Sequence, residues 1–259
     1  MIDKNNPSHF NQSAEKTMRI IEFLAESRRP MRLLDIAANL ELNTSTTLRF
    51  INTLAALGYV GQEPATSKYF LTYRICSISN KIYSKTGLRD IVSPYLKELA
   101  VKARESVCLA VEQNRQVVYI DVADGPDQMV KGMQRIGNIA PLHCTGIGKL
   151  LLLNYTENEL EELITEKGLL KYTDHTITTK EELLKELEQV KKTGYAFDNE
   201  ECELGARCVA FPIYDFTQKI IAGFSITGPV NRITEDFIHT ILPLLKSIAS
   251  EISGKLSAS

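Results

Sequence analysis

The chain has 259 residues, of which 44% are hydrophobic and 24% are charged, a composition typical of a globular protein with room for two domains. No apolar run reaches the roughly 20 residues that span a bilayer, and the first residues lack the apolar core of a signal peptide. Five scattered cysteines show no metal-binding spacing, which favours a reducing compartment. We therefore expect a cytoplasmic protein with no membrane partner.

Charge is distributed unevenly along the chain. Residues 1–88 contain 11 Lys and Arg against 7 Asp and Glu, whereas the remainder contains 19 against 25, and the net charge is −2. A mildly basic amino-terminal part joined to an acidic remainder is consistent with nucleic-acid contact at one end.

Residues 33–72 have the pattern of a helix-turn-helix with a wing. A short amphipathic helix over 33–40 is followed by a turn at 41–43. A second helix begins at Thr44 and ends near Gly58, a residue that tolerates left-handed dihedrals. In such motifs the second helix enters the major groove of DNA.

Two further segments complete this motif. A helix over residues 13–27 is expected to close a three-helix core, and strand-like segments at 58–62 and 69–72 form a hairpin directly after the second helix. The sequence therefore predicts a winged helix-turn-helix DNA-binding domain over residues 1–73.

The second helix of the motif carries polar side chains suited to DNA. Arg and Asn pair bidentately with guanine and adenine edges, and hydroxyls at a helix amino terminus suit phosphate oxygens. A plain helical hairpin with Ser and Thr caps would need no DNA, but the wing favours DNA binding. The predicted apolar stripe comprises Leu48, Ile51, Leu54, Ala55 and Leu57. The predicted DNA contacts are Thr44, Ser45, Thr46, Thr47, Arg49 and Asn52 of this helix and Lys68 of the wing.

The rest of the chain mixes strand and helix patterns. Apolar residues at helical spacing, including Ile75, Ile78 and Ile82, predict a linker helix within residues 74–88. We expect strands at 107–112, 117–123, 128–135, 207–214 and 219–227, and helices at 90–105, 146–153, 157–167, 180–193 and 234–256. Because strands and helices do not alternate strictly, an antiparallel α+β domain over 89–259 is favoured over a parallel sheet.

Two segments of this second domain, 137–149 and 194–213, are rich in polar residues and glycines. The first places Thr145, Gly146 and Gly148 at the start of an apolar helix, where free backbone N–H groups suit a carboxylate or another small anion.

At these motifs the chain resembles the IclR family of bacterial transcription regulators. The resemblance covers the winged helix, the linker helix, residues 141–145 (Pro-Leu-His-Cys-Thr), residues 194–213 and residues 223–229. It implies a GAF-like effector-binding domain with an antiparallel sheet, dimers that commonly pair into tetramers, and control of catabolic genes by small organic acids. Gly146 and Thr227 stand where the family often has Ala and Ser.

The resemblance also implies where the effector binds. Carried over position by position, the family's pocket falls on Gly146, Ile147, Asp198, Cys208, Ser225 and Thr227. Ser225 and Thr227 are two apart on a predicted strand, so both face the same side. From the residues alone, the same six positions serve equally well as capping and core residues of an α+β sandwich.

Other chemistries have weaker support in the sequence. His143 and Cys144 are adjacent on a segment expected to be extended, so their side chains should point apart and not form a nucleophile–base pair. Cys144, Cys202, Cys208, His143 and Asp198 could meet and hold zinc, but their spacing does not indicate it, and no cofactor is expected.

Two functions therefore remain open from the sequence. The alternative is a small-molecule-processing enzyme with an accessory winged helix, but no nucleophile–base pair or metal motif supports it. We expect a protein that is not an enzyme: a ligand-responsive transcription regulator, acting as a homodimer or homotetramer. Its expected partners are an operator duplex and a small carboxylate.

Overall fold

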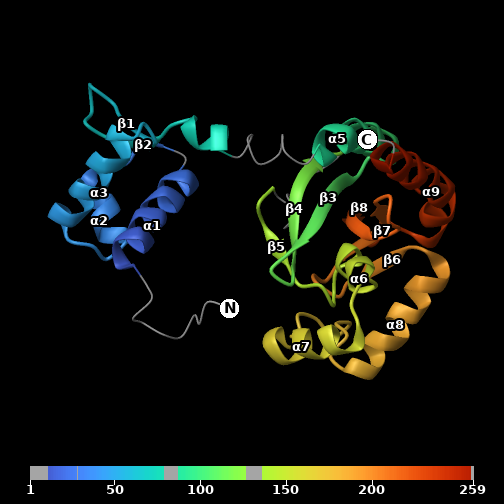
Figure 1. Cartoon of the computed structure of the whole chain (residues 1–259). Helices are drawn as coiled ribbons and strands as arrows, with labels where there is room; N and C mark the ends of the chain where they lie inside the picture. Colours follow the sequence, from blue (N-terminus) through green and yellow to red (C-terminus); the bar gives the residue numbers. More distant parts are fainter. Residues whose placement is uncertain (1–10, 28, 79–86, 127–135, 258–259) are drawn as a thin grey trace. The chain divides into compact units, whose positions relative to one another are not determined.

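The computed structural model describes residues 11–27, 29–78, 87–126 and 136–257. The chain folds as two compact units, residues 1–85 and residues 86–259, which are drawn together in Figure 1 and are described separately below. Within the described residues, no helix is both long and apolar enough to cross a membrane.

The amino-terminal unit is a three-helix bundle with a hairpin. Its elements are α1 (Gln12–Glu26), α2 (Leu33–Asn39), α3 (Thr44–Ala56), β1 (Val60–Gln62) and β2 (Tyr69–Leu71). Two asparagines start helices by accepting backbone N–H groups: Asn11 from Ser13 and Ala14, and Asn43 from Thr46. The predicted winged helix-turn-helix is confirmed.

The buried face of α3 differs from the predicted stripe. The buried residues of this helix are Thr47, Phe50, Ile51 and Leu54. Leu48 and Leu57 are instead 37% and 52% exposed, and Ala55 is also exposed, so the prediction was wrong at these positions. Thr47 lies in the core instead, where its hydroxyl is satisfied by donating to the Asn43 carbonyl at 3.0 Å.

The hairpin is attached to the helices through its second strand. The backbone N–H of Met31 donates to the Tyr69 carbonyl at 2.9 Å, and the N–H of Tyr69 donates back at 2.8 Å. Met31 lies between α1 and α2, so this bridge joins the helical part to the wing. The wing is therefore attached to the three helices by backbone hydrogen bonds.

The carboxy-terminal unit is built on an antiparallel sheet of six strands in the order β5-β4-β3-β8-β7-β6. The strands are β3 (Ser106–Gln113), β4 (Gln116–Ala123), β5 (Ile139–Ala140), β6 (Ala196–Asn199), β7 (Ala206–Tyr214) and β8 (Ile220–Pro229). The helices are α5 (Leu88–Ala103), α6 (Gly146–Leu152), α7 (Glu157–Lys167), α8 (Lys180–Thr193) and α9 (Glu235–Ser257).

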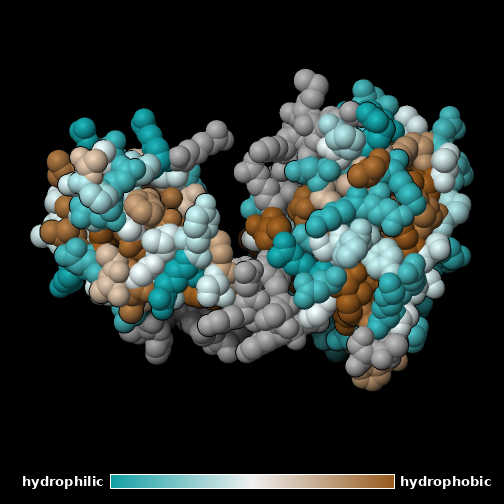
Figure 2. All heavy atoms as spheres, turned by 90° about the horizontal axis from the view of Figure 1, so that it is seen from above, coloured by the Kyte–Doolittle hydropathy of each residue, from teal (hydrophilic) through white to brown (hydrophobic). Residues whose placement is uncertain are grey.

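Each face of this sheet is covered by its own set of helices (Figure 1). Leu109 and Phe224 belong to the core shared with α5 and α9, whereas Cys108 and Ala210 belong to the core shared with α6, α7 and α8. Neighbouring residues of a strand point to opposite faces, so Cys108 and Leu109 enter different cores. Hydrophilic side chains cover much of the face seen in Figure 2, with brown patches between them.

The antiparallel α+β fold predicted from the sequence is confirmed. The helices at 157–167 and 180–193 have the predicted bounds, whereas the short strands β5 and β6 were not predicted. The strand expected at 128–135 lies outside the described residues. Of the expected linker helix, residues 74–78 are helical, and residues 79–86, which include Ile82, also lie outside the described residues.

Candidate functional site

The outward face of α3 is the candidate nucleic-acid interface. Arg49 and Asn52 are exposed, and the Arg49 guanidinium lies 5.5 Å from the centre of the Phe50 ring. A shallow hollow of about 580 Å³ runs along this face and is lined by Ser45, Leu48, Arg49, Asn52, Thr53, Ala56 and Leu57. The Leu48 side chain gives the hollow an apolar surface, the kind that contacts a thymine methyl group.

The Ser and Thr residues at the start of α3 differ in their exposure to solvent. Thr44 and Ser45 are exposed and Thr46 is half-buried, while the Ser45 hydroxyl donates to the Asn43 side chain at 3.0 Å. Thr47 is fully buried, so its predicted side-chain contact with DNA is corrected: its hydroxyl belongs to the core.

The wing tip places Lys68 beside an internal hydrogen-bond network. The Lys68 carbonyl accepts from the Glu63 N–H at 2.8 Å, and its own N–H donates to the Thr66 hydroxyl at 3.3 Å. Thr66 in turn donates to the Glu63 carboxylate. Lys68 therefore has a fixed backbone at the tip.

The predicted effector residues of the sheet lie in two neighbouring cross-strand rows. Asp198 pairs with Cys208, and Cys208 pairs with Thr227, across β6, β7 and β8. In the adjacent row, Ser225 lies between Ala210 and Cys108. Paired residues share a face of the sheet, so these side chains all lie on the α6 side.

The amino terminus of α6 packs tightly on these rows. A Cβ atom added to Gly146 would lie 3.0 Å from both the Cys208 sulfur and the Ala210 Cβ. The Gly146 backbone therefore lies directly against the Cys208 sulfur, and the Ser225 hydroxyl lies 3.1 Å from the Cys108 sulfur. Gly146, Cys208 and Ser225 therefore contact partners within the protein, and Ile147 is buried beside them.

Asp198 is the carboxyl residue of these rows. Its carboxylate accepts the backbone N–H groups of Glu201 at 2.8 Å and Cys202 at 3.3 Å. Burial is the main cause that raises the pKa of Asp198 from 3.8 to about 7. Near neutral pH the carboxyl is therefore divided between its protonated and ionised forms.

A buried lysine that was not predicted lies beside Asp198. The Lys149 ammonium, on α6, donates to Glu201 at 2.6 Å, to Glu186 at 2.9 Å and to the Phe197 carbonyl at 3.0 Å. Burial opposes its charge, but the two carboxylates outweigh burial and the pKa of Lys149 is raised. The available signal was a single charged residue in an otherwise apolar helix.

Two cysteines also meet at this end of α6. The sulfur of Cys144 lies 3.2 Å from that of Cys202, and the Nε2 atom of the neighbouring His143 lies 3.1 Å from the Leu170 carbonyl oxygen. The segment was expected to be extended, and this was wrong, because residues 142–145 form bends. Within the described part of the chain, no group of three or more His, Cys, Asp and Glu side chains is suited to a metal ion.

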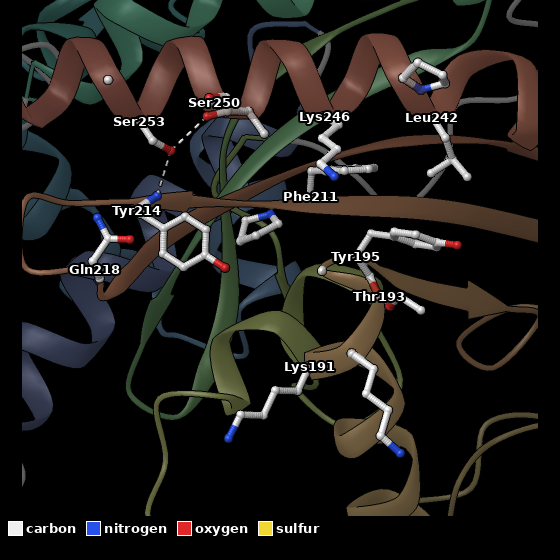
Figure 3. A pocket seen from close by; sticks show the side chains of 16 residues that line it. Lys191, Thr193, Tyr195, Phe211, Tyr214, Gln218, Leu242, Lys246, Ser250 and Ser253 are labelled. Atoms are coloured by element: carbon white, nitrogen blue, oxygen red, sulfur yellow. Dashed lines mark hydrogen bonds between the residues drawn. The ribbon is translucent and has the colours of Figure 1, made fainter.

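A cavity of about 800 Å³ lies between α9, β7 and the end of α8 (Figure 3). Lys246 and Leu242 of α9 line one wall, Phe211 lies on the strand beneath, and Lys191 extends from the end of α8. The backbone N–H of Tyr214 donates to the Ser253 hydroxyl at 3.0 Å at one end of the cavity. No predicted effector residue lines this cavity, and sequence patterns gave no sign of it.

Comparison with known proteins covers both units. The sequence model described as the IclR helix-turn-helix domain matches residues 13–64, and the model described as the bacterial transcriptional regulator IclR C-terminal domain matches residues 80–254. The chain is 34% identical over 244 residues to the HTH-type transcriptional regulator KdgR of Dickeya chrysanthemi, covering 94% of this chain and 79% of that protein.

Solved structures show the same fold. The crystal structure of the Thermotoga maritima IclR matches with a TM-score of 0.85 and 31% identity, covering 94% of this chain and 98% of that one. An IclR homologue from Microbacterium hydrocarbonoxydans, crystallised in complex with 4-hydroxybenzoate, matches with a TM-score of 0.79 and 22% identity over 95% of this chain and all of that one.

The raised pKa of Asp198 predicts a pH dependence of stability. A carboxyl whose folded pKa exceeds its unfolded pKa binds its proton more tightly when folded. The contribution of Asp198 to the free energy of unfolding is therefore fully present below about pH 4 and is lost as the pH rises through about 7. Asp198→Asn keeps an oxygen acceptor for both N–H groups but cannot ionise. We expect wild-type unfolding free energy to fall relative to the variant between pH 4 and pH 7, by up to a few kcal/mol in denaturant titrations. A constant difference across this range would show that Asp198 ionises normally.

Proposed function

The chain belongs to the IclR family of bacterial transcriptional regulators, and we propose that it controls catabolic genes in response to a small carboxylate. It is a regulator and not an enzyme, as its family and its relatives indicate. The observation that carries the effector proposal is the cross-strand row of Asp198, Cys208 and Thr227 beneath the start of α6.

For DNA, the proposed contacts are side chains on the outward face of α3 and at the wing. Arg49 and Asn52 are proposed to contact base edges, while Thr44, Ser45, Thr46 and Lys68 contact phosphates. The exposure of Arg49 and Asn52, and the hollow that they line, support this assignment.

For the effector, the proposed site is the cross-strand row together with Gly146, Ile147 and Ser225. A half-protonated Asp198 suits a carboxylate ligand, because the two acids can share one proton. The 4-hydroxybenzoate complex of the Microbacterium homologue supports a carboxylate as ligand class.

Four residues of this site, Gly146, Ile147, Cys208 and Ser225, are buried in the described structure, and their burial bears on the mechanism. The ligand must displace the close contact of Gly146 with Cys208 and the contact of the Ser225 hydroxyl with the Cys108 sulfur. Binding therefore selects an arrangement in which α6 has moved from the sheet. Differential affinity for two such arrangements is what a ligand needs in order to regulate.

The Arg49 assignment predicts a selective loss of DNA affinity. Arg49→Ala should weaken binding to the preferred operator by about 1–3 kcal/mol, with little change on random duplex, because a base contact carries sequence information. Lys68→Ala is the matched comparison: a lost phosphate contact should weaken all duplexes alike and reduce the salt dependence. Fluorescence anisotropy with both duplexes at several salt concentrations measures this. Wild-type binding by both variants would contradict the assignment.

The proposed assembly is at least a homodimer, because specific operators usually present two half-sites about one helical turn, or a multiple of it, apart. Ile75 and Ile78, on the helical residues 74–78, are proposed to lie near the pairing surface, and Ile78 is 43% exposed. We expect sedimentation at micromolar concentration to give a dimer or tetramer. A monomer under these conditions would contradict the proposal.

The effector site predicts a loss of response in a double variant. Ser225→Ala with Thr227→Val removes two hydroxyls from the α6 face and should abolish the calorimetric heat of the effector while effector-free DNA binding stays intact. The probes are 4-hydroxybenzoate and a panel of short aliphatic carboxylates, and any probe that binds wild type is used.

Lys246→Ala is the matched comparison for this experiment, because it alters the separate cavity against α9. We expect it to bind the probe as wild type does. Loss of binding in Lys246→Ala together with retention in the double variant would place the effector in the α9 cavity and overturn the proposed site.

A further inference from the structure

The cysteine pair at the start of α6 has no role in the function described so far. Cys144 and Cys202 are 58 residues apart in the chain, yet their sulfurs lie 3.2 Å from each other. Cys144 is fully buried, whereas Cys202 is partly exposed on the loop between β6 and β7. The fold therefore brings the two sulfurs together, and Cys202 is the one closer to solvent.

The surroundings of the pair favour a thiolate on one sulfur. The hydrogen bond with Cys202, the neighbouring His143 and the charge of Lys149 lower the pKa of Cys144 to about 6. The same hydrogen bond and burial raise the pKa of Cys202. A thiolate that accepts a hydrogen bond from a neighbouring thiol is the arrangement of a redox-active pair.

The other cysteines of this unit differ from the pair. Burial raises the pKa of Cys108 to about 11, and burial also raises the pKa of Cys208. Both are buried thiols on the sheet, whose contacts are with Ser225 and with Gly146. Reactive cysteines have low pKa values, so these two are expected to be inert.

We propose that Cys144 and Cys202 form a reversible disulfide when the protein meets a small hydroperoxide such as hydrogen peroxide. The Cys144 thiolate attacks one peroxide oxygen, the O–O bond breaks, and the departing hydroxide takes a proton from solvent to become water. The resulting sulfenic acid is attacked by the Cys202 sulfur. The S–S bond forms, the S–O bond breaks, and the Cys202 proton leaves with that oxygen as a second water.

The electron balance of this reaction is simple. Two thiols lose two electrons in all, and one peroxide gains them to give two molecules of water. A dithiol reductant reverses the reaction by thiol–disulfide exchange. Transient disulfides of this regulatory kind occur in otherwise reducing compartments.

The geometry requires only a small movement. A disulfide has an S–S distance of about 2.05 Å, so the two sulfurs must approach by roughly 1.2 Å. Cys202 lies in the turn between Glu200, with φ of 61°, and Gly205, with φ of 79°, where no regular strand or helix fixes the chain. The N–H of Cys202 donates to Asp198, so the new bond would form beside the proposed effector row.

The test uses the full chain, graded hydrogen peroxide, and alkylation under denaturing conditions before and after oxidation. We expect the alkylatable thiols to fall from five to three, without an intermolecular product, and to return to five after treatment with dithiothreitol. Peptide mapping without reductant should then show residues 144 and 202 in one cross-linked species. This measurement needs no variant, so a folding defect cannot obscure it.

Variants supply the second arm of the test. Cys144→Ser and Cys202→Ser should each abolish the internal cross-link, whereas Cys76→Ser, which changes an exposed cysteine of the other unit, should leave it intact. Retention of five thiols by folded wild type at peroxide concentrations that oxidise a free thiol would overturn the proposal. So would a cross-link that maps to other cysteines. Neither result bears on the carboxylate site, which is tested separately.

Discussion

The ion pairs and hydrogen bonds of the buried Lys149 ammonium are the interactions on which the α6 side of the sheet depends. A charge fully removed from water must be paired and hydrogen-bonded, since an unpaired buried charge costs several kcal/mol. Its partners come from three separate elements: Glu186 of α8, the Phe197 carbonyl of β6, and Glu201 of the following loop. One amine therefore determines the position of α6 against the helix, strand and loop around it.

The position of α6 close to the sheet also requires glycine at positions 146 and 148. A Cβ atom at Gly148 would lie 2.3 Å from the Leu142 carbonyl, and one at Gly146 would press on Cys208 and Ala210. The helix can lie this close to the sheet and to its own preceding segment only without those side chains. In the same region Cys144 approaches Cys202 and Asp198 is half-buried, and this burial is the main cause of the raised pKa of Asp198.

Local signals predicted much of the fold. Helix α7 begins at a capping box of Thr156 with Glu159 and ends at Gly168, and α8 ends at Gly194, so both could be bounded from the sequence alone. The cross-strand row of Asp198, Cys208 and Thr227 came from family resemblance and not from periodicity. The contact of Cys144 with Cys202 and the partners of Lys149 could not be predicted, because they join segments far apart in the chain. Thr47 was misplaced because one hydrogen bond to Asn43 satisfies a hydroxyl that pattern rules assign to the surface.

The bridge between Met31 and Tyr69 has a consequence for how a signal can reach DNA. Two backbone hydrogen bonds join the wing to the connection between the first two helices, so the angle between wing and α3 is built into the fold. In the proposed dimer, each unit held in this way contacts its half of the operator as one rigid body. What a signal can then alter is the separation and relative twist of two such bodies, which changes how tightly an operator is held without changing the base sequence that each body prefers.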